Sequence, residues 1–150
     1  MPTDTTAEAQ VVLLDTSLAI ALVVEDHEAH EAAMGAVRGL PLGLSGHAWF
    51  ETYSVLTRLP GRNRRSPADA LRLLAHNFPA SVFLRETDSQ ALGGEIARLG
   101  FSGGAAYAAL VGAAARAHGL PLWSVDARAR PVYEGLGVDH EFIALVPPER

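Results

Sequence analysis

Apolar runs alternate with amphipathic segments along the chain, and this order predicts strands that alternate with helices. Short uninterrupted apolar runs are typical of strands buried on both faces of a sheet. We interpret as strands residues 11–14, 42–44, 81–84, 120–125 and 141–143. Helices are predicted at residues 18–24, 26–38, 46–59, 66–78, 87–100, 104–115 and 128–136. Strands joined by crossover helices predict an α/β domain, with a parallel sheet covered by helices on both faces.

Local signals predict where several helices begin and end. Ser66 followed by a proline predicts a helix start, and Ser45 is expected to cap the helix over 46–59. Thr87 and Gln90 have the spacing of a capping box. Gly39 is well placed to end the helix over 26–38.

Length and composition predict one soluble domain. The chain has 150 residues, 49% of them hydrophobic and 19% charged, and no apolar run approaches the roughly 18 residues of a membrane span. We expect a domain over 11–146, with a flexible tail over 1–10 and a short tail over 147–150. The first residues have no basic start and no apolar stretch, which argues against a secretory signal. The absence of cysteine fits a reducing cytoplasm, and the lack of a long apolar run predicts no membrane association.

Charge adds one candidate surface. A formal net charge of -5 disfavours indiscriminate coating of nucleic acid. All 12 cationic residues are arginines, and five of them fall within fifteen positions: Arg58, Arg62, Arg64, Arg65 and Arg72. Because guanidinium groups bind phosphate in a bidentate manner, this segment is a candidate RNA-backbone patch. A solvated loop in an arginine-rich chain explains the same cluster.

Two aspartates occupy equivalent places in the predicted fold. Asp15 and Asp126 each follow an apolar run and precede a helix, so in a parallel sheet both face the crevice above the strand ends. Each aspartate is equally suited to cap the helix that it precedes. The hydroxyl residues Thr16, Ser17 and Ser124 beside them favour a shared polar site.

Glu51, inside the helix over 46–59, is a third candidate acid, although a lone helical glutamate is usually solvated. Three converging carboxylates repel one another and need protonation or a cation. With oxygen ligands only, the cation is Mg²⁺ or Mn²⁺, which can polarise a phosphodiester and activate water, as in metal-dependent nucleases. The six histidines are scattered, and no phosphate-binding loop motif is present.

Three segments together resemble a known family. They are VVLLDTSLAIAL, HAWFETYSVLTRLP and GGAAYAALVGAAARAHGLPLWSVDARA. In this order and spacing the chain, over residues 11–143, resembles a PIN-domain ribonuclease toxin of the VapC type. The resemblance implies a three-layer α/β/α sandwich with a mainly parallel sheet, and endoribonuclease activity that depends on Mg²⁺ or Mn²⁺. It further implies a homodimer inhibited by a cognate VapB-type antitoxin, within a type II toxin–antitoxin system.

The resemblance assigns the acids and shows a gap among them. Asp15, Glu51 and Asp126 match three family acids and are expected to hold the metal, with Thr16 and Ser124 as supporting hydroxyls. The remaining family acid belongs where this chain has Ala108. Engineered replacement of an aspartate and natural divergence both explain the alanine. In either case the missing ligand is expected to weaken metal binding and impair catalysis.

Other functional classes are compatible with parts of the pattern. A catalytically silent PIN-fold module that binds an antitoxin or RNA is the main alternative. A receiver-type phosphoacceptor domain also gathers acids at strand ends but relies on a lysine, and this chain has none. A phosphatase with an aspartate nucleophile expects a second acid where Ser17 stands. The alanine-rich helix over 104–115 fits either a helix buried within the fold or a dimer interface.

Overall fold

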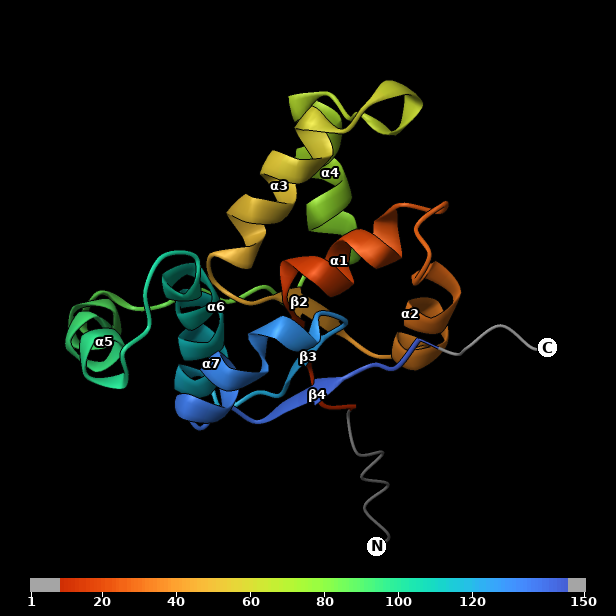
Figure 1. Ribbon diagram of the computed structural model, residues 1–150. Helices are drawn as coiled ribbons and strands as arrows, with labels where there is room; N and C mark the ends of the chain where they lie inside the picture. The colour runs from red at the N-terminus through yellow and green to blue at the C-terminus, as the bar shows by residue number, and fades with distance from the viewer. Residues whose placement is uncertain (1–8, 146–150) are drawn as a thin grey trace, which may run out of the picture.

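A parallel sheet of four short strands lies at the centre of the part that the computed structural model describes, residues 9–145 (Figure 1). The strands are β1 (Val12–Leu14), β2 (Leu42–Leu44), β3 (Leu122–Ser124) and β4 (His140–Phe142). Their order in the sheet is β2–β1–β3–β4, and each neighbouring pair is parallel. The predicted parallel sheet is therefore confirmed.

Seven α-helices surround the sheet within the described residues. They are α1 (Thr16–Val23), α2 (His30–Val37), α3 (Ala48–Arg58), α4 (Pro67–Asn77), α5 (Glu86–Leu99), α6 (Ala105–Ala117) and α7 (Arg130–Gly135). Two short 3-10 helices, Gly61–Asn63 and Ala127–Ala129, follow α3 and β3. Figure 1 shows α5, α6 and α7 on one side of the sheet, and α1, α2 and α4 on the other.

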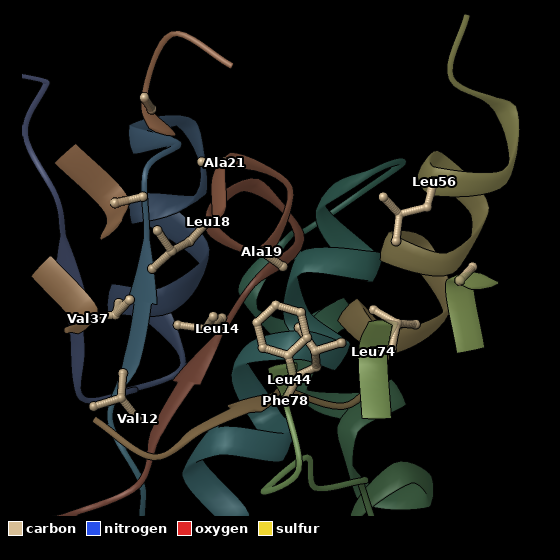
Figure 2. Close-up of a cluster of buried hydrophobic side chains, with 13 residues drawn as sticks. Val12, Leu14, Leu18, Ala19, Ala21, Val37, Leu44, Leu56, Leu74 and Phe78 are labelled. Atoms are coloured by element: carbon tan, nitrogen blue, oxygen red, sulfur yellow. The ribbon is translucent and has the colours of Figure 1, made fainter. Parts of the chain in front are cut away.

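The alternation of side chains along β1 creates two hydrophobic cores. Val12 and Leu14 pack with residues of α1, α2 and α4, and Figure 2 shows Leu14 among Leu18, Val37 and Phe78. Leu13 points to the opposite face and packs with residues of α5, α6 and α7. Since successive strand residues face opposite sides, one buried strand supplies both cores. The three-layer α/β/α sandwich is confirmed.

The alanine-rich helix α6 is buried within the chain itself. The small residues from Ala109 to Ala115 lie in the core between the sheet and the helices α5 and α7, apart from the half-buried Leu110. At Gly112, a Cβ atom would lie 3.2 Å from the ring of Tyr133, so a small residue permits this close packing. The buried-helix interpretation accounts for the composition of α6 without a second protomer.

Two of the predicted elements differ from the structure. Residues 81–84 form only an isolated bridge, between Ser45 and Val82, instead of a strand. The Ser81 hydroxyl accepts the Leu44 amide at 2.9 Å, in the place where a sheet ladder would use a backbone carbonyl. The helix predicted from residue 26 begins at His30. The His27 ring accepts the Ala29 amide at 3.0 Å, a local bond that competes with a helical turn.

The predicted helix ends were partly correct. Ser66 caps α4 by accepting the Asp69 amide at 3.2 Å, as expected. The cap predicted at Ser45 is wrong, because its hydroxyl instead donates to the Val111 carbonyl at 2.6 Å. The capping box at Thr87 is also wrong, since Thr87 lies inside α5, which starts at Glu86 without a side-chain cap.

The predicted tails fall largely outside the part of the chain described. Residues 1–8 and 146–150 are not among the described residues, so the tail over 147–150 and most of that over 1–10 lie beyond them. Between residues 9 and 145, no helix is both long enough and apolar enough to cross a membrane.

Candidate functional site

The strand order places a crevice between the carboxyl ends of β1 and β3. In the sheet, β2 lies on one side of β1 and β3 lies on the other side. The chain therefore runs in opposite directions across the sheet from this point, and the gap between β1 and β3 is a topological switch point. Asp15 directly follows β1, and Asp126 lies two residues beyond β3. A cavity of about 320 Å³ opens here, and all four predicted acid positions line it: Asp15, Glu51, Ala108 and Asp126. We call it the acidic cavity.

Asp15 is buried and hydrogen-bonded through both carboxylate oxygens. Its side chain is only 5% exposed. Oδ1 accepts the Ser17 hydroxyl at 2.6 Å and the Leu18 amide at 3.2 Å, so Asp15 also caps α1 as the sequence suggested. Burial raises the pKa of Asp15 above its usual range, although hydrogen bonds from Ser124, Ser17 and Leu18 oppose the shift.

Tyr133, on α7, is a site residue that the sequence did not indicate. Its hydroxyl donates to Oδ2 of Asp15 at 2.9 Å, and the side chain is buried. Burial and the negative charge of Asp15 raise the pKa of the Tyr133 phenol. Tyr133 therefore stays protonated and remains a donor to Asp15 while it lines the acidic cavity.

Hydroxyl groups connect the ends of β1 and β3. The Ser17 and Ser124 oxygens lie 3.1 Å apart. Ser17 accepts the Val125 amide at 3.1 Å, and Ser124 accepts the Asp126 amide at 3.0 Å. Ser124, expected as a supporting hydroxyl, therefore fixes the backbone that carries Asp126.

Glu51 reaches the acidic cavity from the first turn of α3. The Thr16 hydroxyl, from the start of α1, donates to Glu51 Oε2 at 3.1 Å. On the other side, His47 Nε2 lies 3.4 Å from Glu51 Oε1. Thr16 thus links two packed helices, and Glu51 lies on the same side of the sheet edge as Asp15. His47 was missed, although its spacing of four residues from Glu51 was a local signal.

Asp126 forms an ion pair with Arg128, two residues further along. The two carboxylate oxygens each accept a guanidinium nitrogen at 2.9 Å, and Oδ1 also accepts the Arg128 amide. The Arg128 guanidinium therefore holds the pKa of Asp126 below its usual value. The two pKa values are thus shifted in opposite directions: burial raises that of Asp15, and the Arg128 guanidinium lowers that of Asp126.

Ala108 occupies the wall of the acidic cavity near the start of α6. Its side chain is half-buried, and it lines the cavity with Tyr107 and Val111 of the same helix. A methyl group at this point contributes no oxygen ligand. The geometry fits a position from which a longer acidic side chain could reach the cavity.

The carboxylates of the acidic cavity offer the type of ligand atom that a hard divalent cation prefers. Asp15, Glu51 and Asp126 offer only oxygen, the ligand that Mg²⁺ and Mn²⁺ prefer. Within residues 9–145, no three acidic or histidine side chains are grouped closely enough to hold an ion as they lie. Asp126 would have to exchange its guanidinium partner for the metal.

The arginine cluster divides into separate environments. Arg58 lines a cavity of about 610 Å³ that adjoins the acidic one. Arg62 and Arg65 line a different cavity of about 450 Å³, together with Glu25 and Asp26. Arg64 donates to the Leu59 carbonyl at 2.9 Å. Of these four arginines from the candidate RNA-backbone patch, only Arg58 lines a cavity that adjoins the acidic cavity.

Comparison with known proteins places the chain in a family. The PIN domain matches residues 12–135. The chain is 45% identical over 125 residues to Ribonuclease VapC27 of Mycobacterium tuberculosis, covering 83% of this chain and 91% of the relative. Its fold is similar to that of M. tuberculosis VapC20, a sarcin–ricin loop cleaving toxin, with a TM-score of 0.61 and 18% identity over 79% of this chain and 92% of that one.

A second solved structure has a similar fold. It is VapBC2 from Rickettsia felis, bound to a DNA fragment from its promoter, with a TM-score of 0.62 and 10% identity. The similarity covers 89% of this chain and 98% of that one. The family match and the close relative agree with the three sequence segments that resembled VapC toxins. The chain therefore belongs to the PIN domain family, as a member of its VapC type.

Proposed function

We propose that the chain is a metal-dependent endoribonuclease toxin of a type II toxin–antitoxin system. The observation that carries the proposal is the acidic cavity, which Asp15, Glu51 and Asp126 line from three distant segments of the chain. Its place at the switch point of a parallel sheet is where α/β folds bind ligands. The 45% identity to a protein named as a ribonuclease supports RNA as the substrate.

The proposed chemistry divides between a bound ion and the residues that hold it. Mg²⁺ or Mn²⁺ at the carboxylates would polarise the scissile phosphodiester and make bound water more acidic. Asp15 is held in place by Ser17, Leu18 and Tyr133, so its orientation is set before an ion binds. Thr16 holds Glu51 in the same way from the other side. Such preorganisation reduces the cost of assembling the site.

We also propose that catalysis is impaired in this chain, because Ala108 stands where the family pattern has an acid. The side chain lines the acidic cavity but offers no oxygen, so the chain has one ligand fewer than the family pattern. An alanine at this position is compatible with the fold, because alanine is the best helix former and α6 is continuous through residue 108. We therefore expect a folded chain with low nuclease activity.

The test is to restore the acid. Ala108→Asp should cleave RNA in the presence of Mn²⁺ at least about tenfold faster than the parent chain, since losing metal-site groups costs that much or more. Ala108→Asn is the matched control, because it has the same shape without the charge. A hairpin containing a sarcin–ricin loop and several unrelated RNAs serve as substrates. Absence of cleavage by the Asp form on all of them overturns the proposal.

A catalytically silent binding module is the second candidate. It is favoured by Ala108 itself, since the chain as it stands lacks one acid. This function predicts tight binding of an antitoxin or RNA, and it predicts that Ala108→Asp leaves cleavage undetectable while binding is unchanged. The restoration experiment therefore distinguishes the two candidates.

We also propose partners and a location for the protein. A cognate VapB-type antitoxin is the expected inhibitor, supported by the fold shared with a VapBC complex. A homodimer in the cytoplasm is expected from the VapC type. Coexpression with a candidate VapB-type antitoxin, followed by light scattering on the purified protein, tests both the complex and the dimer. A monomer that captures no such partner contradicts them.

A further inference from the structure

A second cavity continues from the acidic cavity along α3. Its volume is about 610 Å³, and three residues line both cavities: Thr16, Glu51 and Tyr107. Its other lining residues recur at helical spacing along one side of α3, starting from the residue that precedes the helix: His47, Phe50, Ser54, Val55 and Arg58. From Glu51 to Arg58 this side of α3 extends about 10 Å along the helix axis. We call the second cavity the α3 groove.

An aromatic pair stands where the α3 groove meets the acidic cavity. The rings of Tyr107 and His47 are stacked, with centroids 5.1 Å apart and planes inclined by 21°. His47 is also near Glu51, at 3.4 Å, so contacts on two sides hold the imidazole. Tyr107 remains 54% exposed although its ring is held by the stack. An exposed aromatic ring of fixed orientation is a surface on which a flat group can stack.

A cation stands at the opposite end of the α3 groove. Arg58 forms no ion pair with any residue between 9 and 145, whereas Arg116, Arg128 and several others do. Its guanidinium is therefore available to a ligand anion. Tyr107 and Glu51 at the junction and Arg58 further along α3 line one continuous surface, which offers a ring for a base and a cation for a phosphate.

We infer that the α3 groove binds an unpaired nucleotide beside the scissile phosphodiester, with its base stacked on Tyr107 and a flanking phosphate at Arg58. The inference rests on the proposed ribonuclease function and assigns Tyr107 and Arg58 as residues that position its RNA substrate. Bases inside an A-form duplex are stacked on their neighbours and cannot present a face to a protein ring, whereas unpaired bases can. Stacking tolerates any base, so it selects for strandedness rather than sequence.

The parent chain is suited to the test, because low nuclease activity allows binding to be measured directly. Fluorescence anisotropy in EDTA gives the affinity for a labelled oligouridylate. Tyr107→Leu should bind about tenfold more weakly, as loss of one base–aromatic stack does elsewhere. Tyr107→Phe should bind like the parent. Leu71→Ala is the surface control, since Leu71 is an exposed apolar residue that lines neither cavity.

A chain of abasic ribonucleotides separates stacking from structural effects. Tyr107→Leu should bind this abasic chain as well as the parent does, because no base is present to stack. For Arg58→Gln, the slope of log affinity against log salt should fall by about 0.7, the value for one phosphate contact on a single strand. These results together support the inference.

Several outcomes overturn it. Equal loss of affinity for the uridylate and the abasic chain assigns Tyr107 to structure rather than to base stacking. Tighter binding of duplex RNA than of single strands contradicts the substrate class. A change in oligomeric state with unchanged RNA affinity assigns the Tyr107 surface to a second copy of the chain. If Ala108→Asp cleaves RNA while Tyr107→Leu binds RNA as tightly as the parent, the base-stacking inference is wrong but the proposed ribonuclease function stands. If Ala108→Asp does not cleave RNA and the parent does not bind it, the proposed function is wrong as well.

Discussion

Tyr133 and Asp15, which are 118 positions apart in the chain, meet inside the fold through a hydrogen bond of 2.9 Å. Tyr133 comes from α7 and Asp15 from the end of β1, so the bond joins the last helix to the central strand. Because Ser17 and Leu18 occupy the other carboxylate oxygen, the three donors together fix the rotation of the Asp15 side chain. Tyr133 is thus a positioning residue for the proposed metal ligand.

Tyr133→Phe keeps the ring and removes only the donor. We expect the free energy of unfolding to fall by about 1–3 kcal/mol, since a buried carboxylate loses a partner. The affinity for Mn²⁺ should fall as well, because Asp15 loses one of the three donors that fix its orientation. Urea unfolding and calorimetric titration with Mn²⁺ measure the two effects. Tyr53→Phe, on α3 and away from the acidic cavity, is the control; an equal change in both variants contradicts a specific role.

The raised pKa of Asp15 predicts a pH dependence of stability. The unfolded aspartate titrates near its ordinary pKa of 3.8, whereas burial raises the pKa in the fold. Between these two values the folded chain binds a proton that the unfolded chain has lost. The free energy of unfolding therefore falls as the pH rises through this window, and the loss persists above it.

Asp15→Asn removes that titration and should change the pH profile of the metal-free protein. Relative to the parent, the variant should gain stability as the pH rises above the ordinary aspartate pKa of 3.8. Asp126, Asp69 and Glu95, whose pKa values are lowered, contribute the opposite slope in both proteins and cancel in the difference. Urea unfolding at several pH values measures the difference in free energy of unfolding between the variant and the parent. A difference that does not vary with pH contradicts the proposed effect of burial on Asp15.

The layers of the fold and the strand-end positions of Asp15 and Asp126 could be predicted because both depend on local patterns. A strand such as β1 is recognisable from its apolar run, and an acid at its end follows by simple adjacency. Convergence of Asp15 with Asp126 then follows from parallel pairing of β1 and β3. The place of Glu51 did not follow in this way, because it depends on how α3 packs against α1, which no local pattern encodes.

The residues that the sequence missed are mostly fixed by long-range packing. Tyr133 lies on a helix of six residues, and nothing near it in the chain points to Asp15. Ser45 was predicted to be a helix cap, but its hydroxyl donates to the carbonyl of Val111, a residue that tertiary packing brings next to it. Arg128 differs, since it lies two residues from Asp126 and could have been recognised as a local partner.

Gly46, two residues before α3, allows the turn into α3 to pack against α6. Its φ is +55°, and a Cβ atom there would lie 2.8 Å from the Ala114 side chain. Gly46→Ala should therefore lower the free energy of unfolding by about 1–3 kcal/mol through backbone strain and overpacking. Gly35→Ala, in α2 and with open space around it, should instead stabilise the fold by about 0.5–1 kcal/mol. Urea unfolding tests both, and a loss of equal size in the two variants contradicts the steric explanation.

Arg128 should compete with a metal ion for Asp126. Its side chain is 91% exposed, yet it occupies both carboxylate oxygens that an ion would need. Arg128→Gln should therefore tighten binding of Mn²⁺, by less than about tenfold because exposed ion pairs are weak. Arg130→Gln is the matched control, since it removes the same charge nearby but Arg130 contacts Glu134 and the Phe142 ring instead. Calorimetric titration without RNA measures the affinities. An equal gain in both variants means that the general positive charge opposes the ion, whereas a gain confined to Arg128→Gln identifies the pair with Asp126 as the barrier.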